Sequence, residues 1–536
     1  MYQIRPTGLI TRNDLPPHEV PAEFLTDVQN VSFRDVFPER VRGFRPIYDA
    51  NVTIGSPLFL LPNVFQGTNY WIYGCDNEVG VTDSAGVHTD LSPVSGAPSA
   101  VTSDQWTGCE LNGFPVLNWQ STGGPHSWNR SVGSNVAPLV DWPSGYSCGA
   151  IRSFKNFLIA LNIAGAVDWP SVALWSDSAA PGNLPDDGAG TTWTATAHND
   201  AGSLSFGDTG TGITDGLGLR DDFMVYKTNS THAMEYLEGS SLIFGQRELF
   251  RTIGALATNC VTEWQGHHIV FGDGDVVIHD GNQVRSLIDK VTRRKLYSEL
   301  SQEHFARSFV VNHKNQNEVF ICYPTEGDTY PTKVLVWDAN SDTTKFKDTI
   351  DIFGGLSFRD CVTGGSGTPH MAHGNISTSG ASDAWSAQVA TWATTNRSWD
   401  EFKVRDATDG LVAIDTDADE LVEFDIGNSY STGTLNASLT RESLDMGDAE
   451  QVKLVTEVLP RITGTKGDIV SIRIGSQMTP DETITWSPYQ TFRIGEDQKI
   501  YTFARGRYIS IEVISSGGSV WRCTGFDFTV RFDGVY

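Results

Sequence analysis

The sequence predicts an all-β protein with few helices, and two observations lead to this prediction. Glycine and proline occupy 53 and 23 of the 536 positions, and both residues interrupt regular helices. Short runs of β-branched and aromatic residues alternate with turn-forming residues, for example at residues 157–161, 268–271 and 333–337. The Asp- and Gly-containing segments 215–216 and 273–275 are expected to be hairpin turns.

A loose internal repeat predicts the architecture of the larger domain. A hydrophobic strand, a Gly/Asp/Asn turn, a second strand and an aspartate-bearing turn recur at residues 263–281, 309–338, 148–177 and, less completely, 69–81. Such a meander fits the blade of a β-propeller, which typically spans about 40–50 residues and buries both faces against its neighbours. We therefore expect a propeller-like repeat domain over residues 61–353, although the spacing is irregular and carries no WD or kelch signature.

The rest of the chain predicts a second β domain. Residues 354–429 are expected to form a connecting region, because they begin with a long Gly/Ser/Thr-rich stretch. Beyond residue 430, alternating runs such as 469–474 and 507–513 indicate strands with one buried face. This alternation is typical of a β-sandwich, so residues 430–536 are expected to form a C-terminal sandwich-like domain.

One segment is expected to be helical. Over residues 289–301, apolar residues recur near one face of a helix. The segment is also locally basic, since seven Lys/Arg and three Asp/Glu occur between residues 281 and 315. Arg293, Arg294 and Lys295 are therefore candidate interaction residues. The alternative is a solvated helix at the edge of a sheet.

The charge distribution limits the possible partners. The chain has 38 Lys and Arg against 65 Asp and Glu, which gives a net charge of −27. A broad basic face for the outside of a DNA duplex is therefore not expected. Residues 50–129 and 157–219 contain no Lys or Arg, and thirteen acids face three bases between residues 401 and 450. Such acidic surfaces fit either simple solubility or a wall that repels a polyanion.

No motif of an enzyme or cofactor site is present. The sequence has no Walker A loop, G-x-S-x-G turn, HExxH or CxxC pair, and no Rossmann fingerprint in a strand-to-helix context. We therefore expect no catalytic, cofactor-binding or metal-ligating residues. Acidic residues are abundant enough to allow a glycosidase pair, but nothing in the sequence singles out two of them.

Two local patterns that suggest metal binding have simpler interpretations. Residues 415–419 resemble a calcium loop, but an EF-hand needs Gly at its sixth position and Glu at its twelfth. This chain has Glu420 and Ile426 there, so an acidic, solvated turn is expected. His267 and His268 are consecutive in a predicted strand, so their rings point to opposite faces and a structural role is expected.

Cysteine usage and hydropathy predict a soluble protein made in a cytoplasm. Seven scattered cysteines are expected to be buried free thiols, as in a reducing compartment. The N-terminus lacks the pattern of a signal peptide, and the longest apolar stretch, residues 157–167, is shorter than the roughly 20 residues of a membrane span. No membrane insertion is expected. The cysteines are Cys75, Cys109, Cys148, Cys260, Cys322, Cys361 and Cys523.

Several stretches resemble virion proteins of tailed bacteriophages. They include N-terminal, central and C-terminal runs, and the central run is followed by the basic helix. Together they resemble the tail nozzle proteins, also called tail hub or DNA-stabilisation proteins, of short-tailed phages. The stretches are residues 8–21, 27–35, 39–43, 253–281, 506–510 and 521–526.

This resemblance implies a structural virion protein, assembled in the host cytoplasm. It implies a hexameric ring of identical subunits in the phage tail, below the portal and adaptor. Each subunit would carry a β-propeller and a sandwich platform, and residues 1–60 would join the platform. The ring would enclose the DNA exit channel, retain the genome, pass it at ejection without sequence-specific binding, and anchor tail fibres or a needle. The resemblance implies no enzymatic activity and no cofactor.

Two other functions fit the same sequence. One is a tail-associated propeller that depolymerises glycans, which would need two carboxylates in one pocket about 5–9.5 Å apart. The other is a propeller that binds a host receptor without catalysis.

Overall fold

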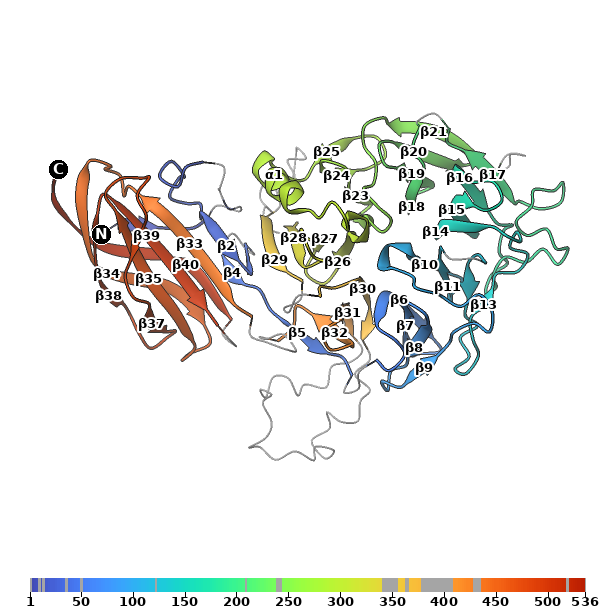
Figure 1. Ribbon diagram of the computed structural model, residues 1–536, viewed down its shortest axis with the longest axis horizontal. Coiled ribbons are helices and arrows are strands. Elements are labelled where there is room, and N and C mark those ends of the chain that lie inside the picture. The colour runs from blue at the N-terminus through green and yellow to red at the C-terminus, as the bar shows by residue number, and fades with distance from the viewer. Residues whose placement is uncertain are drawn as a thin grey trace, which may run out of the picture.

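Seven four-stranded antiparallel sheets form a β-propeller in the computed structural model, and two six-stranded sheets form a β-sandwich beside it (Figure 1). The predicted all-β fold, with a propeller and a sandwich, is confirmed. The structure describes residues 2–7, 11, 15–33, 37–48, 52–120, 123–207, 210–237, 243–339, 355–361, 366–376, 408–427, 435–516 and 520–535.

Six blades follow one another in chain order, each as a simple four-stranded meander. Blade 1 has β6 (Pro57–Phe65), β7 (Thr68–Cys75), β8 (Val79–Thr82) and β9 (His88–Asp90); blade 2 has β10 (Trp106–Leu111), β11 (Phe114–Trp119), β12 (His126–Ser127) and β13 (Ala137–Pro138); blade 3 has β14 (Ser147–Phe154), β15 (Phe157–Ala164), β16 (Trp169–Trp175) and β17 (Gly202–Ser205). Blade 4 has β18 (Ile213–Leu219), β19 (Asp222–Lys227), β20 (Thr231–Tyr236) and β21 (Phe244–Phe250); blade 5 has β22 (Val261–Trp264), β23 (His267–Phe271), β24 (Val276–His279) and β25 (Val284–Ser286); blade 6 has β26 (Phe309–His313), β27 (Glu318–Tyr323), β28 (Lys333–Asp338) and β29 (Gly355–Asp360).

The second strands of the blades explain the apolar runs in the sequence. Both faces of a blade are covered by neighbouring blades, so a central strand is apolar almost throughout rather than alternating. In β27 all six residues are buried, and in β15 six of eight are. The turns between strands use residues that accept positive φ, and Gly274, between β23 and β24, has φ of +92°. The predicted turn at residues 273–275 is thereby confirmed.

Blade 7 is closed by a strand from the N-terminal part of the chain. It consists of β30 (Met371–Ile376), β31 (Thr408–Asp415) and β32 (Glu420–Phe424), and β5 (Phe44–Pro46) completes it. Phe44 pairs with Phe424, and Arg45 contacts Glu423 through an ion pair of 3.0 Å. Joining early and late strands in one blade closes the propeller without leaving a long exposed edge.

The structure corrects the expected domain boundaries in this region. Residues 354–429 are not merely a connection, because β29 to β32 lie within them and complete blades 6 and 7. Similarly, the N-terminal 60 residues contribute β5 and the start of β6 to the propeller. The Gly/Ser/Thr-rich composition of residues 354–396 hid the strands β29 and β30, and residues 377–407 lie outside the described part of the chain.

The sandwich is built from both ends of the chain. One sheet has the order β3-β4-β40-β34-β38 with β1 beside β40, and the other has β2-β33-β39-β35-β36 with β37 beside β35. N-terminal and C-terminal strands therefore share one core. The strands are β1 (Tyr2–Ile4), β2 (Asp27–Gln29), β3 (Val31–Ser32), β4 (Glu39–Arg40), β33 (Ala437–Leu444), β34 (Gln451–Gly464), β35 (Ile469–Gln477), β36 (Thr485–Trp486), β37 (Gln490–Arg493), β38 (Ile500–Gly506), β39 (Tyr508–Ser515) and β40 (Trp521–Val535).

The predicted helix is present as α1 (Lys290–Glu299), after blade 5. Asp289 caps it by accepting hydrogen bonds from the backbone N–H groups of Val291 and Thr292. Leu296 lies on its buried face. Two short 3₁₀ turns, η2 (Ser103–Gln105) and η3 (Phe305–Arg307), complete the helical elements of the described residues, none of which is long and apolar enough to cross a membrane.

Candidate functional site at the propeller axis

The first strands of all seven blades surround a cavity of about 380 Å³ at the centre of the propeller. They are β6, β10, β14, β18, β22, β26 and β30. A concave cavity with a few convergent polar groups is the default candidate for a binding or active site, so its polar groups decide what this one can do. The charged and strongly polar side chains that line it are Glu110, Arg152, Asp215, Asn259 and His370.

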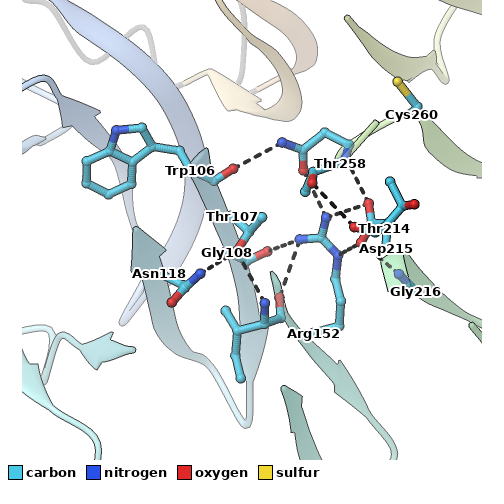
Figure 2. Close-up of polar contacts among 12 residues, drawn as sticks. Trp106, Thr107, Gly108, Asn118, Arg152, Thr214, Asp215, Gly216, Thr258 and Cys260 are labelled. Atoms are coloured by element: carbon cyan, nitrogen blue, oxygen red, sulfur yellow. Dashed lines mark hydrogen bonds and ion pairs between the residues drawn. The ribbon is translucent and has the colours of Figure 1, made fainter. Parts of the chain in front are cut away.

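Arg152 and Asp215 form a two-point ion pair across blades 3 and 4 (Figure 2). Nε of Arg152 lies 2.9 Å from Oδ1 of Asp215, and Nη2 lies 2.9 Å from Oδ2. Both side chains are largely buried. The remaining guanidinium protons go to the carbonyls of Gly108 and Ile151 and to Oδ1 of Asn259, so all five donors are engaged.

The carboxylate of Asp215 is equally saturated. Besides Arg152, its Oδ1 accepts from the backbone N–H of Gly216 at 2.7 Å, and its Oδ2 accepts from that of Asn259 at 2.8 Å. The Asn259 amide also donates to the carbonyl of Trp106 at 3.1 Å. The network therefore ties blades 2, 3, 4 and 5 together at the axis, and it leaves Asp215 no free position to act as a base or nucleophile.

A second set of contacts continues the network between blades 2 and 3 (Figure 2). The Asn118 amide donates to Thr107 Oγ1 at 3.3 Å and to the Cys148 carbonyl at 3.1 Å. Thr107 Oγ1 in turn accepts from the backbone N–H of Ile151 at 3.2 Å. These buried polar groups satisfy one another, which is the pattern of a structural network.

His370 lies at the opposite side of the cavity, between aromatic rings. Its ring centre is 4.6 Å from that of Phe59 and 5.4 Å from that of Phe309, and its Nδ1 accepts from the backbone N–H of Leu60. Desolvation, followed by the charge of Arg152, lowers the pKa of His370 to about 3. The imidazole is therefore neutral at physiological pH and acts as an acceptor that fixes β6.

The three predicted interaction residues lie on α1 but have different surroundings. Arg293 donates to Asp275 at 2.7 Å and to Ser286, so it holds the helix on blade 5. Lys295 lies 4.4 Å above the ring of Phe358 in β29. Arg294 is exposed. Two of the three thus make contacts within the chain, and Arg294 is the exposed one.

The two neighbouring histidines diverge as expected from strand geometry. His268 is buried, and its Nδ1 lies 2.7 Å from the hydroxyl of Tyr226, which is also 2.7 Å from Nε2 of His279. His268 Nε2 donates to the carbonyl of Gly218, and His279 Nδ1 accepts from the N–H of Gly281. The donors are therefore assigned: Nε2–H of His279 donates to the hydroxyl of Tyr226, and that hydroxyl donates to Nδ1 of His268. His267 is half-buried, and its Nδ1 lies 3.1 Å from the carbonyl of Gln265.

Other sequence patterns are placed as follows. The expected turn is present at residues 416–419, where Asp417 is exposed, but it is wrong for Asp415, which ends β31 and is buried. The predicted turn at residues 215–216 is also wrong, because both residues lie inside β18 beside a register shift.

All seven cysteines are buried and free, as predicted.

Sequence reasoning missed Arg152, Asp215 and Asn259. These residues are 44–107 positions apart and meet only because the blades converge. One signal was available: Arg152 stands inside a strand-like run, between two segments rich in acid and poor in base. A charged residue in such a run usually has a buried partner.

Comparisons with known proteins identify no family. No family model matches the chain, and no curated protein matches it. Among solved structures, the extracellular domain of a one-component system from B. thetaiotaomicron matches at TM-score 0.31 and 10% identity, over 53% of this chain and 39% of that one. The exo-β-1,3-galactanase of Phanerochaete chrysosporium matches at TM-score 0.26 and 8% identity, over 92% and 100%. At these TM-scores the likenesses carry no argument about function.

Proposed function

We propose that this protein is a structural component of a phage virion, which assembles with copies of itself into a ring-shaped tail nozzle. The ring would lie below the portal and adaptor, hold the packaged genome and pass it at ejection. Two features support this beyond the sequence resemblance. The sandwich combines strands from both chain ends, as the resemblance implies. The polar groups at the propeller axis bind one another and stabilise the contacts between blades.

The main support for self-assembly is the edge strand β38. It is the last strand of its sheet, so one side of its backbone has no neighbouring strand in that sheet. Its inward side chains, Ile500 and Ala504, are buried, whereas Tyr501 and Phe503 are 62% and 75% exposed. Exposed aromatic residues on an unpaired edge mark a surface that a protein partner covers. In a closed ring, each copy would cover the edge of the next.

The charge distribution supports a channel that does not grip DNA. The base-free segments, residues 50–129 and 157–219, form blade 1, most of blade 2 and much of blade 3. Blades 2 and 3 lie on the side of the propeller away from the sandwich (Figure 1). The one arginine at the axis of this region, Arg152, is neutralised by Asp215. Phosphates would find little to bind on these blades.

The saturation of Asp215 also counts against the glycan depolymerase. A glycosidase needs two carboxylates with free oxygens facing one substrate. In the axial cavity Asp215 is fully engaged, and Glu110 accepts from the Asn63 amide at 3.0 Å. We therefore propose a protein without enzymatic activity. Shortening of host capsule polysaccharide by the purified chain would contradict this proposal.

A charge placed on the edge strand β38 tests whether the ring assembles through this strand. Phe503→Asp, expressed with the portal and adaptor in phage-infected cells, should fold but fail to enter virions. Val94→Asp is the matched control, because Val94 is 96% exposed on the propeller. Virions that contain both variants equally would contradict assembly through β38. Absence of the wild-type chain from purified virions would contradict the function as a whole.

A further inference from the structure

A second cavity lies at the outer part of blade 3 and has walls of aromatic rings. Its volume is about 340 Å³, near the lower end of the range of about 300–1,000 Å³ typical of small-molecule sites. It is bordered by β15, β16 and β17, the loop after β13 and the loop before β17. Its aromatic residues are Trp142, Tyr146, Trp169 and Trp193, and the side-chain hydroxyls at its edge include Thr194 and Ser203.

The four rings form two pairs. Trp142 and Trp193 meet edge to face, with centroids 4.8 Å apart, and Tyr146 stacks on Trp169 at 5.4 Å with planes 19° apart. Trp193 is buried, but Trp169 is 45% exposed. A large aromatic ring so exposed beside a cavity is available to a ligand as well as to packing.

The loops that carry Trp142 and Trp193 are held together before any ligand binds. The hydroxyl of Thr192, which is fully buried, donates to Oδ2 of Asp141 at 2.8 Å. Asp141 and Thr192 directly precede the two tryptophans in the chain. The Asn199 amide closes the second loop by donating to the carbonyls of Thr191 and Thr194 at 2.8 and 2.9 Å. A site ordered in this way loses little conformational entropy on binding.

The charge of the lining restricts the ligand. None of the described residues that line the cavity is charged. Its strands β15, β16 and β17 belong to the base-free segment, residues 157–219, so an anionic ligand would have no cation to bind. Aromatic rings can attract a cation on their own, but none of the described lining residues is a carboxylate that would neutralise its charge. The lining therefore favours an uncharged ligand, with apolar faces for the rings and hydroxyls for the edge.

We propose that this cavity binds an uncharged pyranose ring of a glycan. The C–H face of the sugar would lie on the indole of Trp169, and its hydroxyls would exchange hydrogen bonds with the groups around Thr194 and Ser203. The nozzle would then contact neutral sugars of the host surface through blade 3. This binding is a property of the single chain, so it does not depend on whether the proposed ring forms.

The test is a titration of the purified full-length chain, followed by saturation-transfer NMR. Neutral probes are methyl β-D-glucopyranoside, methyl β-D-galactopyranoside and N-acetylglucosamine; glucuronic acid and choline are charged probes. At least one neutral probe should bind, and Trp169→Ala should weaken it at least about tenfold, which corresponds to the loss of one aromatic contact. The matched control is Phe503→Ala, which removes an exposed aromatic ring from the sandwich and should leave binding unchanged.

A second variant tests the positioning of the rings. Thr192→Val should weaken sugar binding because it releases Asp141, and Thr192→Ser should restore it because the hydroxyl remains. The proposal is overturned if no neutral probe binds, if Trp169→Ala binds as tightly as the wild type, or if only glucuronic acid or choline binds. Binding of a polymer of the same sugar, but of no monomer, would also overturn it, because the cavity as described takes a single ring.

Discussion

Arg152 and Asp215 face each other at the propeller axis through two parallel hydrogen bonds of 2.9 Å, and neither retains an unused hydrogen-bonding position. An ion pair of this kind holds neighbouring blades together but offers no free hydrogen-bond donor or acceptor to a substrate. The polar network at the centre of the propeller therefore stabilises the contacts between blades. Binding functions are expected at the periphery of the propeller and on the sandwich.

Removing one partner of this pair should destabilise the propeller strongly. Asp215→Leu leaves the buried guanidinium without its counter-charge, and the free energy of unfolding should fall by about 3–5 kcal/mol. The double variant Arg152→Met/Asp215→Leu should recover a large part of that loss. Urea unfolding measures both. Asp221→Ala is the control, since Asp221 is exposed in its ion pair with Lys155 and should matter by less than about 1 kcal/mol.

The buried chain of His279, Tyr226 and His268 should make stability depend on pH. Desolvation lowers the pKa of His268 to about 4 and that of His279 to about 3, so both are neutral in the folded protein. The unfolded chain binds protons on both below about pH 6.5, and the folded chain does not. The free energy of unfolding is thus unaffected by these histidines above pH 6.5. It falls as the pH drops from 6.5 toward 3, by up to about 1.4 kcal/mol per pH unit for each histidine.

His279→Gln isolates this contribution. The variant should be less stable at pH 8, because hydrogen bonds to Tyr226 and Gly281 are lost, but its stability should fall less steeply below pH 6.5. His267→Gln, on the other face of β23, is the matched control. Thermal unfolding over pH 4–8 measures the slopes, and equal slopes for the wild type and His279→Gln would contradict the assignment.

A reciprocal contact fixes the sandwich to the propeller. Asn30, between β2 and β3, donates to the carboxylate of Asp360 in β29 at 2.9 Å and accepts from its backbone N–H at 2.9 Å. Figure 1 shows β29 facing this part of the sandwich. Asp360→Ala should loosen the two domains with little effect on either core. The expected result is a broader distance distribution between spin labels on β38 and β21, with Asp409→Ala as a surface control.

Positive charge on blade 1, which contains no Lys or Arg, should slow genome release. Val64, Val87 and Val94 on or near blade 1 are exposed, and their replacement by lysine gives phosphates a surface to bind. Ejection kinetics of phage carrying the triple lysine variant should be slower than those of the wild type, and more so at low salt. The triple threonine variant controls for the loss of the valines. Equal ejection kinetics for the wild type, the triple lysine variant and the triple threonine variant would argue against blade 1 facing the channel.

Local patterning in the sequence predicted the strands that lie in blade interiors. Runs such as residues 318–322 and 333–337 are apolar and branched because both faces are covered, and they became β27 and β28. The helix α1 followed from the spacing of its apolar residues. The strands of residues 355–376 and 408–424 were missed because they lie in or beside a Gly/Ser/Thr-rich stretch.

The sites could not be predicted, for a different physical reason. Asp215 was interpreted as a turn residue from its neighbour Gly216, yet in β18 the glycine is needed because a Cβ there would lie 2.6 Å from the ring of Phe223. The aromatic cavity depends on the Thr192–Asp141 hydrogen bond between loops 51 residues apart. Local sequence carries no information on such distant pairs.

The most direct test of the central claim is the symmetry of the assembled tail. End-on images of tails from purified virions should show a sixfold ring, and a tag on Tyr536 of this chain should decorate that ring six times. A tail without this chain, or a chain present once per virion and outside any ring, would contradict the account.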